Sequence, residues 1–169
     1  MCWGGGMETS PALTADDRRH LRRCVDLAAE AVDAGDEPFG SVLVDAEGAE
    51  RFADRNRVKD GDRTRHPEFE IARWAAVHMT LEERAAATVF TSGEHCPMCA
   101  AAHAWVGLGR IVYASSTVQL RAWHDELGLA PGPVAPLPIP QVAPGVDVAG
   151  PDPDLAGEIR ALHARAVRR

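Results

Sequence analysis

The sequence predicts a three-layer α/β domain, in which a mixed five-stranded sheet lies between two layers of helices. Apolar runs typical of strands alternate with segments of helical period along most of the chain. Only a short turn separates the first two predicted strands, so they should pair antiparallel, whereas the later strands are separated by helices and should lie parallel. No internal repeat and no shift in composition marks a second domain.

The composition is that of an ordinary globular domain with one core. The chain has 169 residues, of which 46% are hydrophobic and 25% charged, and this length suits one domain better than two. No run of eighteen apolar residues occurs, so we expect no transmembrane segment. Residues 1–13 lack the basic and apolar regions of a secretion signal, so we interpret them as a flexible leader before a single domain over 14–169.

The net charge indicates which class of partner to expect, and the cysteine content indicates the cellular compartment. The formal net charge is −7, and the basic residues are scattered. Proteins that bind nucleic acids usually concentrate basic side chains on one face, so the sequence favours a small-molecule substrate over a nucleic acid. Without a secretion signal we expect a cytoplasmic location, where the four cysteines would be reduced. Cys24 lies beside the apolar face of a predicted helix, and we interpret it as a buried core thiol.

The first third of the chain predicts a helix followed by a pair of strands. Thr14 and Asp17 resemble a capping box, and the apolar residues that follow repeat at helical spacing until Gly35. The sequence FGSVLVDAEG is typical of a strand that ends in a turn, and AERFADRN of its antiparallel partner. The polar run RVKDGDRTR then predicts a loop.

The remaining elements alternate between helices and buried strands. HPEFEIARWAAVHM predicts a helix with Pro67 in its first turn, and AATVFTS predicts a buried strand. PMCAAAHAWVG and RIVYAS repeat this order, and TVQLRAWHDELG predicts another helix that ends at Gly128. The Pro-rich segment 130–153 can hold an edge strand or wrap over a surface. Apolar residues at helical spacing then predict a C-terminal helix over 154–168.

Two of the predicted helices begin with residues that can bind a metal. His66 and Glu68 begin one, and Cys96 and Cys99 begin another. The partial positive charge of a helix N-terminus lowers the pKa of a cysteine and favours the thiolate that a metal requires. One imidazole and two thiolates suit Zn²⁺, and three protein ligands leave one position for water, as in catalytic zinc sites. Glu68 could then carry protons between that water and a substrate.

Three other interpretations of the two cysteines stay open at this point. They could form a redox pair, although such pairs usually lie near the start of a βαβ unit. They could belong to a closed structural zinc site that recruits His95 or His103 as its fourth ligand. They could also be two small core residues without a metal. The His-Glu pair upstream favours the catalytic zinc site.

The HPE sequence at His66 and the CPMC sequence at Cys96 together resemble the H-x-E…P-C-x-x-C signature of the zinc-dependent cytidine deaminase-like superfamily. EPFGSVLVD, RNRVKDGDRTRHPE and GLGRIVYAS are similar to runs of its guanine deaminase and tRNA adenosine deaminase branch. The resemblance extends over about residues 21–116. It implies the cytidine deaminase-like α/β/α fold, one Zn²⁺ per chain held by His66, Cys96 and Cys99, and Glu68 as the catalytic proton shuttle.

The resemblance also suggests residues that contact the substrate. Asn56 matches an asparagine that hydrogen-bonds the base, and its alternative role is that of a turn residue. His95 stands where the family usually has proline, and it could contact the substrate, tune the zinc thiolates or point to solvent. Trp123 could stack on a substrate, and Glu126 or its neighbour Asp125 could bind a ring amine. Alternatively, Trp123 could be a packing residue, and Asp125 and Glu126 could form a solvated helix end.

Two further implications concern the substrate and the assembly. Pro67 has no backbone N–H to offer the bound base, where the family usually has alanine or glycine and its N–H commonly faces the base. This departure affects the choice of substrate rather than the type of reaction. The family forms dimers through the helices near the zinc, so we expect a homodimer, and the apolar face with Trp105 and Val106 is a candidate interface.

Three candidate functions follow from these observations, two of them enzymatic and the third of another class. The first is a zinc-dependent hydrolytic deaminase of a small aminated heterocycle, which releases ammonia; guanine or a related nucleobase or nucleoside, cytosine and an amino-triazine are the candidates. The second is deamination of adenosine in tRNA, which the acidic charge and the Pro-rich tail disfavour. The third is a non-catalytic, zinc-stabilised scaffold or binding protein.

Overall fold

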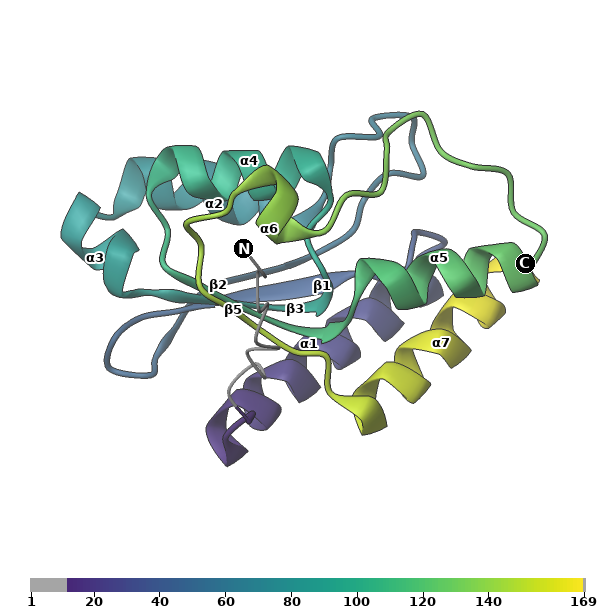
Figure 1. Ribbon diagram of the computed structural model, residues 1–169, viewed down its shortest axis with the longest axis horizontal. Coiled ribbons are helices and arrows are strands. Elements are labelled where there is room, and N and C mark those ends of the chain that lie inside the picture. Colours follow the sequence, from purple (N-terminus) through teal and green to yellow (C-terminus); the bar gives the residue numbers. More distant parts are fainter. Residues whose placement is uncertain (1–11, 169) are drawn as a thin grey trace, which may run out of the picture.

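In the computed structural model, which describes residues 12–168, five strands form one mixed sheet in the order β2-β1-β3-β4-β5 (Figure 1). β1 pairs antiparallel with both β2 and β3, while β3 with β4 and β4 with β5 are parallel. The predicted sheet, with its antiparallel first pair and parallel later strands, is confirmed. Most of the predicted leader lies outside the described residues. The strands are β1 (Gly40–Val44), β2 (Glu50–Arg55), β3 (Thr88–Gly93), β4 (Arg110–Ser115) and β5 (Val148–Ala149).

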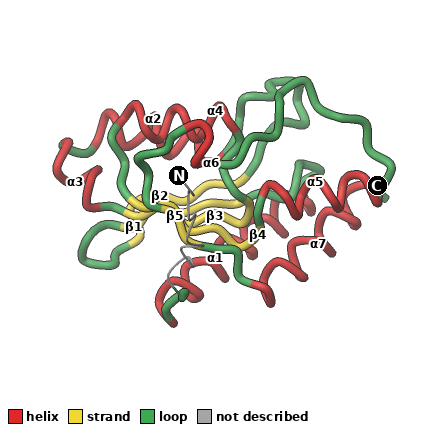
Figure 2. The backbone as a smooth tube through the Cα atoms, viewed as in Figure 1, coloured by secondary structure: helices red, strands yellow, loops and turns green. Residues whose placement is uncertain are grey.

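Helices cover both faces of the sheet (Figure 2). α1, α5 and α7 lie on one face, and α2, α3, α4 and α6 lie on the other. None of the helices in the described part of the chain has the length and hydropathy that a bilayer span requires. The helices are α1 (Ala15–Asp33), α2 (Pro67–His78), α3 (Leu81–Ala86), α4 (Pro97–Val106), α5 (Thr117–Glu126), α6 (Ile139–Val142) and α7 (Pro153–Val167).

The strands bury both faces because successive side chains point to opposite sides of the sheet. Val42 and Phe90 belong to the hydrophobic cluster that contains residues of α1 and α7, whereas Leu43 and Val89 belong to the cluster with α2. At Gly40, α1 passes so close to β1 that a Cβ atom would lie 2.4 Å from the Cβ atom of Leu27. Only glycine permits this approach.

The helix boundaries follow the signals in the sequence. The capping box of α1 is formed, since the Asp17 N–H donates to the Thr14 hydroxyl at 3.0 Å and the Thr14 N–H donates to the Asp17 carboxylate at 2.9 Å. Pro67 begins α2 as predicted, because a first helical residue needs no N–H partner. Cys24 is fully buried in the core beneath α1, as expected.

Two short helices were not predicted. α3 contains no buried residue, so its sequence shows no apolar face at helical spacing. Thr80 and Glu83 nevertheless form a capping box at its start. α6 is a four-residue turn inside the Pro-rich segment. That segment also contains β5, which lies at the edge of the sheet as the proline content allows. The C-terminal helix begins at Pro153, one residue before the predicted start.

The carboxylate of Glu94 anchors the Pro-rich segment to the rest of the fold. One carboxylate oxygen accepts the Thr117 N–H at the start of α5, and the other accepts the Ile139 N–H at the start of α6, both at 2.8 Å. The backbone N–H of Glu94 donates to the carbonyl of Ser115 on β4. A single side chain therefore ties two segments to the loop that follows β3.

Replacing Glu94 with alanine is expected to destabilise the fold by about 2–3 kcal/mol, because two backbone N–H groups lose a charged acceptor. Chemical denaturation would measure the loss, and limited proteolysis should show faster cleavage within residues 130–138. Glu82→Ala is the matched control, since Glu82 is exposed and its carboxylate forms no hydrogen bond within residues 12–168. Equal stability of the two variants would contradict the anchoring role.

Candidate metal centre and active site

Several polar residues meet at one end of the strands. β3 ends there and the antiparallel β1 begins there, and Ser41 and Thr91 are direct register partners. Asn56 follows the last residue of β2. His66 and Cys96 are the N-cap residues of α2 and α4, which pack against each other on one face of the sheet. This end of the sheet thus gathers residues from three strands and two helix starts.

His66, Cys96 and Cys99 form a triangle of the size that a tetrahedral zinc ion requires. The Nδ1 atom of His66 lies 3.6 Å from each sulfur, and the two sulfurs are 3.5 Å apart. Zinc bond lengths predict edges of about 3.6 Å between nitrogen and sulfur and about 3.8 Å between two sulfurs. The donor set and its spacing therefore fit one Zn²⁺ ion. Among the described residues, no fourth His, Cys, Asp or Glu completes the group.

The two thiols of the triangle differ in their electrostatics, since the hydrogen bond with Cys96 and then burial raise the pKa of Cys99 well above its ordinary value. The pKa of Cys96 is lowered to about 4, first because the Cys99 thiol donates to its sulfur and then because His66 lies beside it. Cys96 is therefore a thiolate at neutral pH, which is the form that binds zinc. His103, one of the conceivable fourth ligands, instead bonds the Gly109 carbonyl through Nε2 at 2.8 Å.

Glu68 lies beside this triangle and is 5% exposed. Its Oε1 atom accepts hydrogen bonds from the hydroxyls of Ser41 at 2.9 Å and Thr91 at 2.8 Å. Its Oε2 atom is 3.9 Å from the sulfur of Cys99. Burial raises the pKa of Glu68, and the charge of His66 opposes this effect. A carboxyl group with a raised pKa takes up a proton more readily than an exposed one, as a proton-transfer group requires.

Asn56 is fully buried, and half of its amide has a partner. Its Oδ1 atom accepts the Val58 N–H at 3.2 Å, which is the turn contact expected of an asparagine at a strand end. This bond fixes the orientation of the amide, so Nδ2 is the donor that remains. Nδ2 is buried without a hydrogen-bond partner in the described structure. An unpaired buried donor is costly unless a ligand or water satisfies it.

His95 is buried, so the interpretation that it points to solvent is wrong. Its ring is 1% exposed and packs edge-on against His103 with ring centroids 5.4 Å apart. Burial lowers the pKa of His95 well below its ordinary value, so the ring is neutral. Neither ring nitrogen has a hydrogen-bond partner among the described residues.

Trp123 and Glu126 have partners on α7 rather than among the metal ligands. Trp123 is 8% exposed and packs in the core beneath α1 and α7, with its ring centroid 5.9 Å from that of His163. Glu126 is exposed and pairs with Arg160 at 2.5 Å. Their role in substrate binding stays a prediction, and the contacts seen here are those of packing and of a solvated helix end.

Sequence reasoning missed Ser41 and Thr91 as parts of the site. Both lie in strands that are buried on both faces, and Ser41 is the one polar residue of β1. A polar side chain inside such a strand needs an internal partner. That requirement was a usable signal, but it does not say which partner the hydroxyl meets.

The mixed sheet carries one histidine and two cysteines at two helix starts, with a buried glutamate beside them. The sequence pattern of the cytidine and deoxycytidylate deaminase zinc-binding region matches residues 14–115. That match covers more than half of the chain, so the chain belongs to this family of zinc-dependent deaminases, and Zn²⁺ is the cofactor that the triangle is positioned to bind.

Two named deaminases are similar in sequence to a large part of this chain. A probable cytosine deaminase of Schizosaccharomyces pombe is 31% identical over 123 residues, which are 73% of this chain and 75% of that protein. The guanine deaminase of Bacillus subtilis is 33% identical over 96 residues, which are 56% of this chain and 62% of that protein. The chain therefore spans less than two thirds of the guanine deaminase.

Solved structures agree with the fold. The structure of the B. subtilis guanine deaminase has 31% identity and a TM-score of 0.54, covering 65% of this chain and 69% of that chain. A structure from a study of tRNA:A34 deaminases has 28% identity and a TM-score of 0.53, covering 60% and 78%. A guanine deaminase from Nitrosomonas europaea has 19% identity and a TM-score of 0.66, covering 93% and 89%, and it supports the fold alone.

Proposed function

We propose that the protein hydrolyses the exocyclic amino group of a free nucleobase or a similar small heterocycle and releases ammonia. The observation that carries this proposal is the position of Glu68. Its Oε2 atom lies 3.9 Å from the Cys99 sulfur, beside a three-residue zinc site. A buried carboxyl group at that place can exchange protons with a water molecule and with a ring in the same site.

The chain's own residues supply the proton transfers. The chemistry that zinc supplies when bound is a water molecule acidified to a pKa of about 7. The Oε2 atom of Glu68 accepts a proton from water and delivers it to a ring nitrogen next to the amino-bearing carbon. The oxygen of water then bonds to that carbon. Glu68 passes the second proton of water to the amino group, which leaves as ammonia while the ring keeps a carbonyl.

Asn56 and the overall charge support a small substrate. The unpaired Nδ2 of Asn56 is a donor for a ring nitrogen or a carbonyl oxygen of a base. Pro67, buried at the start of α2, has no N–H to offer a substrate. The net charge of −7 disfavours a polyanion. Cytosine and guanine are the first candidates, because the relatives of this chain include proteins named for those two bases.

An assay of ammonia release with zinc-loaded protein tests the proposal. The panel should contain cytosine, guanine, their nucleosides, an amino-triazine and a tRNA that carries an adenosine at the wobble position. Turnover of a free base with none of the tRNA supports the proposal. Turnover of the tRNA, together with a gel shift that weakens steeply with salt, would instead indicate a tRNA deaminase. No ammonia from any substrate would point to a zinc-stabilised scaffold.

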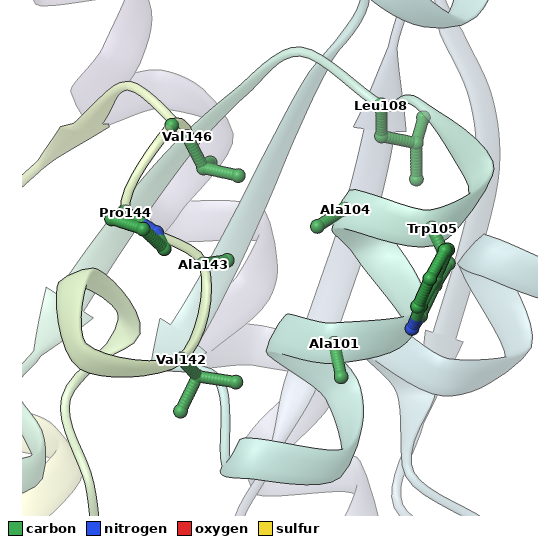
Figure 3. Close-up of a pocket in the computed structure, with 9 residues that line it drawn as sticks. Ala101, Ala104, Trp105, Leu108, Val142, Ala143, Pro144 and Val146 are labelled. Atoms are coloured by element: carbon green, nitrogen blue, oxygen red, sulfur yellow. The ribbon is translucent and has the colours of Figure 1, made fainter.

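We also propose that two copies associate through the helix layer that holds the zinc ligands. Trp105 on α4 is 87% exposed and Val77 on α2 is 79% exposed. Trp105 also lines a groove of about 530 Å³ between α4 and residues 142–146, whose other lining side chains are mainly small and apolar (Figure 3). A large exposed aromatic beside an apolar groove is typical of an interface, and a second copy is the occupant that the family resemblance suggests.

Replacing Trp105 with glutamate is expected to convert a dimer into a monomer of 18.1 kDa, because the charge would be buried without a partner. Light scattering after size-exclusion chromatography measures the mass. Val118→Glu is the matched control: Val118 is 72% exposed on α5, on the opposite face of the sheet, and its variant should stay dimeric. A monomeric wild type, or a dimeric Trp105→Glu variant, contradicts this interface.

A further inference from the structure

We propose that Ser41 and Thr91 are positioning residues that hold the Glu68 carboxylate in one orientation, with Oε1 fixed in the sheet and Oε2 presented to the metal site. The expected effect of these residues on kcat rests on the proposed deaminase function. Their effect on the orientation of the Glu68 carboxylate does not depend on that function.

The hydrogen bonds converge on a single oxygen. Ser41 Oγ lies 2.9 Å and Thr91 Oγ1 lies 2.8 Å from Oε1 of Glu68, and the two hydroxyl oxygens are 2.9 Å apart. Both residues are fully buried, and Glu68 is nearly so. Water therefore does not compete for these contacts, and hydrogen bonds to a charged acceptor are strong in such surroundings.

The arrangement leaves the two carboxylate oxygens with different roles. Each hydroxyl carries one proton, and both protons can be directed at Oε1. Thr91 has the Gly93 carbonyl as a second acceptor at 2.9 Å, whereas Ser41 has the Thr91 hydroxyl. Oε2 receives neither hydroxyl and lies on the side of the Cys99 sulfur. It is therefore the oxygen available to exchange protons with a substrate.

The sheet makes this support rigid. Ser41 on β1 and Thr91 on β3 are direct register partners in the middle of the sheet, so their spacing is set by backbone hydrogen bonds. Glu68 by contrast lies in the first turn of α2 on a side chain with three rotatable bonds. A catalytic group needs its own rotamer fixed by neighbours to reach its productive geometry. Two hydroxyls on adjacent strands provide that restraint.

Hydroxyl deletions test the proposal. Thr91→Val removes the hydroxyl at nearly constant volume, and Ser41→Ala removes it without overpacking. Thr91→Ser keeps the hydroxyl and should therefore keep the wild-type orientation of the Glu68 carboxylate. Ser115→Ala is the matched control, because it deletes a buried hydroxyl on the neighbouring strand that donates to the Ser92 carbonyl at 2.8 Å and does not touch Glu68.

The kinetic expectation separates positioning from general structural damage. In Thr91→Val and Ser41→Ala, kcat should fall about 10- to 100-fold while KM and zinc content stay near the wild-type values. Thr91→Ser should stay within about 3-fold of the wild type, since its hydroxyl still reaches Oε1. Deletions that lower kcat no more than Ser115→Ala does would overturn the proposal.

A crystal structure of the zinc-loaded Ser41→Ala/Thr91→Val double variant gives a second readout that needs no activity. The Glu68 carboxylate should occupy a different rotamer or several, whereas in the wild type Oε1 should lie between the two hydroxyls. An unmoved carboxylate in the double variant overturns the positioning role even if the protein is an active deaminase. A displaced carboxylate in a protein that releases no ammonia supports the positioning role and refutes the proposed reaction.

Discussion

The Glu68→Gln variant is expected to lower kcat for ammonia release by about 1,000-fold, in the middle of the range for loss of a general acid–base group. Glutamine has the shape of glutamate and can still accept the hydroxyl protons of Ser41 and Thr91 through its amide oxygen. It cannot take a proton from water at neutral pH or return one to the ring. The loss should therefore fall on kcat rather than on folding or zinc binding.

Steady-state assays with the best substrate of the panel measure this effect, with the zinc content determined on the same samples. Glu70→Gln is the matched control, because Glu70 lies two residues further along α2 and its carboxylate forms no hydrogen bond with another residue of the described part of the chain. Its variant should keep the wild-type rate. A Glu68→Gln variant with more than about a tenth of the wild-type kcat is incompatible with the proposed role, since general acid–base groups contribute at least about 100-fold.

Removal of zinc is expected to abolish activity and to lower the melting temperature by about 10 °C. A ligand present at about a thousand times its dissociation constant stabilises the native state by about 4 kcal/mol, and each kcal/mol shifts the midpoint by about 2–4 °C in a chain of this size. The stabilisation arises because His66 and the two cysteines join the starts of α2 and α4, which the unfolded chain cannot bring together.

Chelation followed by dialysis, with melting curves before and after zinc is restored, measures the effect. His66→Ala should show the low melting temperature from the outset and should not respond to added zinc. Cys24→Ala serves as the control, because Cys24 is a buried thiol of the core beneath α1 and should leave the response to chelation intact. An unchanged melting temperature after proven loss of the metal would rule out His66, Cys96 and Cys99 as its ligands.

The zinc-binding triad and the mixed character of the sheet could be predicted from the sequence, because the triad follows from residues at two helix starts and the sheet from the connections between its strands. His66 and Cys96 stand at helix starts that proline marks, and their side chains have few other reasons to be there. The antiparallel and parallel pairs followed from the length of each connection.

The features that were missed depend on contacts between distant residues. Ser41 and Thr91 are fifty positions apart, and only the register of β1 against β3 brings their hydroxyls to one carboxylate. The side chain of His95 lies in the loop between β3 and α4, and its orientation depends on how this loop folds. The sequence alone therefore left solvent exposure open as one interpretation of His95. α3 escaped notice because none of its side chains is buried, and helix recognition relies on an apolar face.

The register of β1 has a consequence for how faithfully the protein must fold. A slip of one residue would exchange the faces of Ser41 and Val42, since strand side chains alternate. A hydroxyl would then enter the hydrophobic cluster beneath α1, and a valine would face Glu68. A chain with this register error would thus lose packing in its core and would also lose a hydrogen bond to the Glu68 carboxylate. Natural selection for a well-packed interior and selection for turnover therefore act on the same strand pairing.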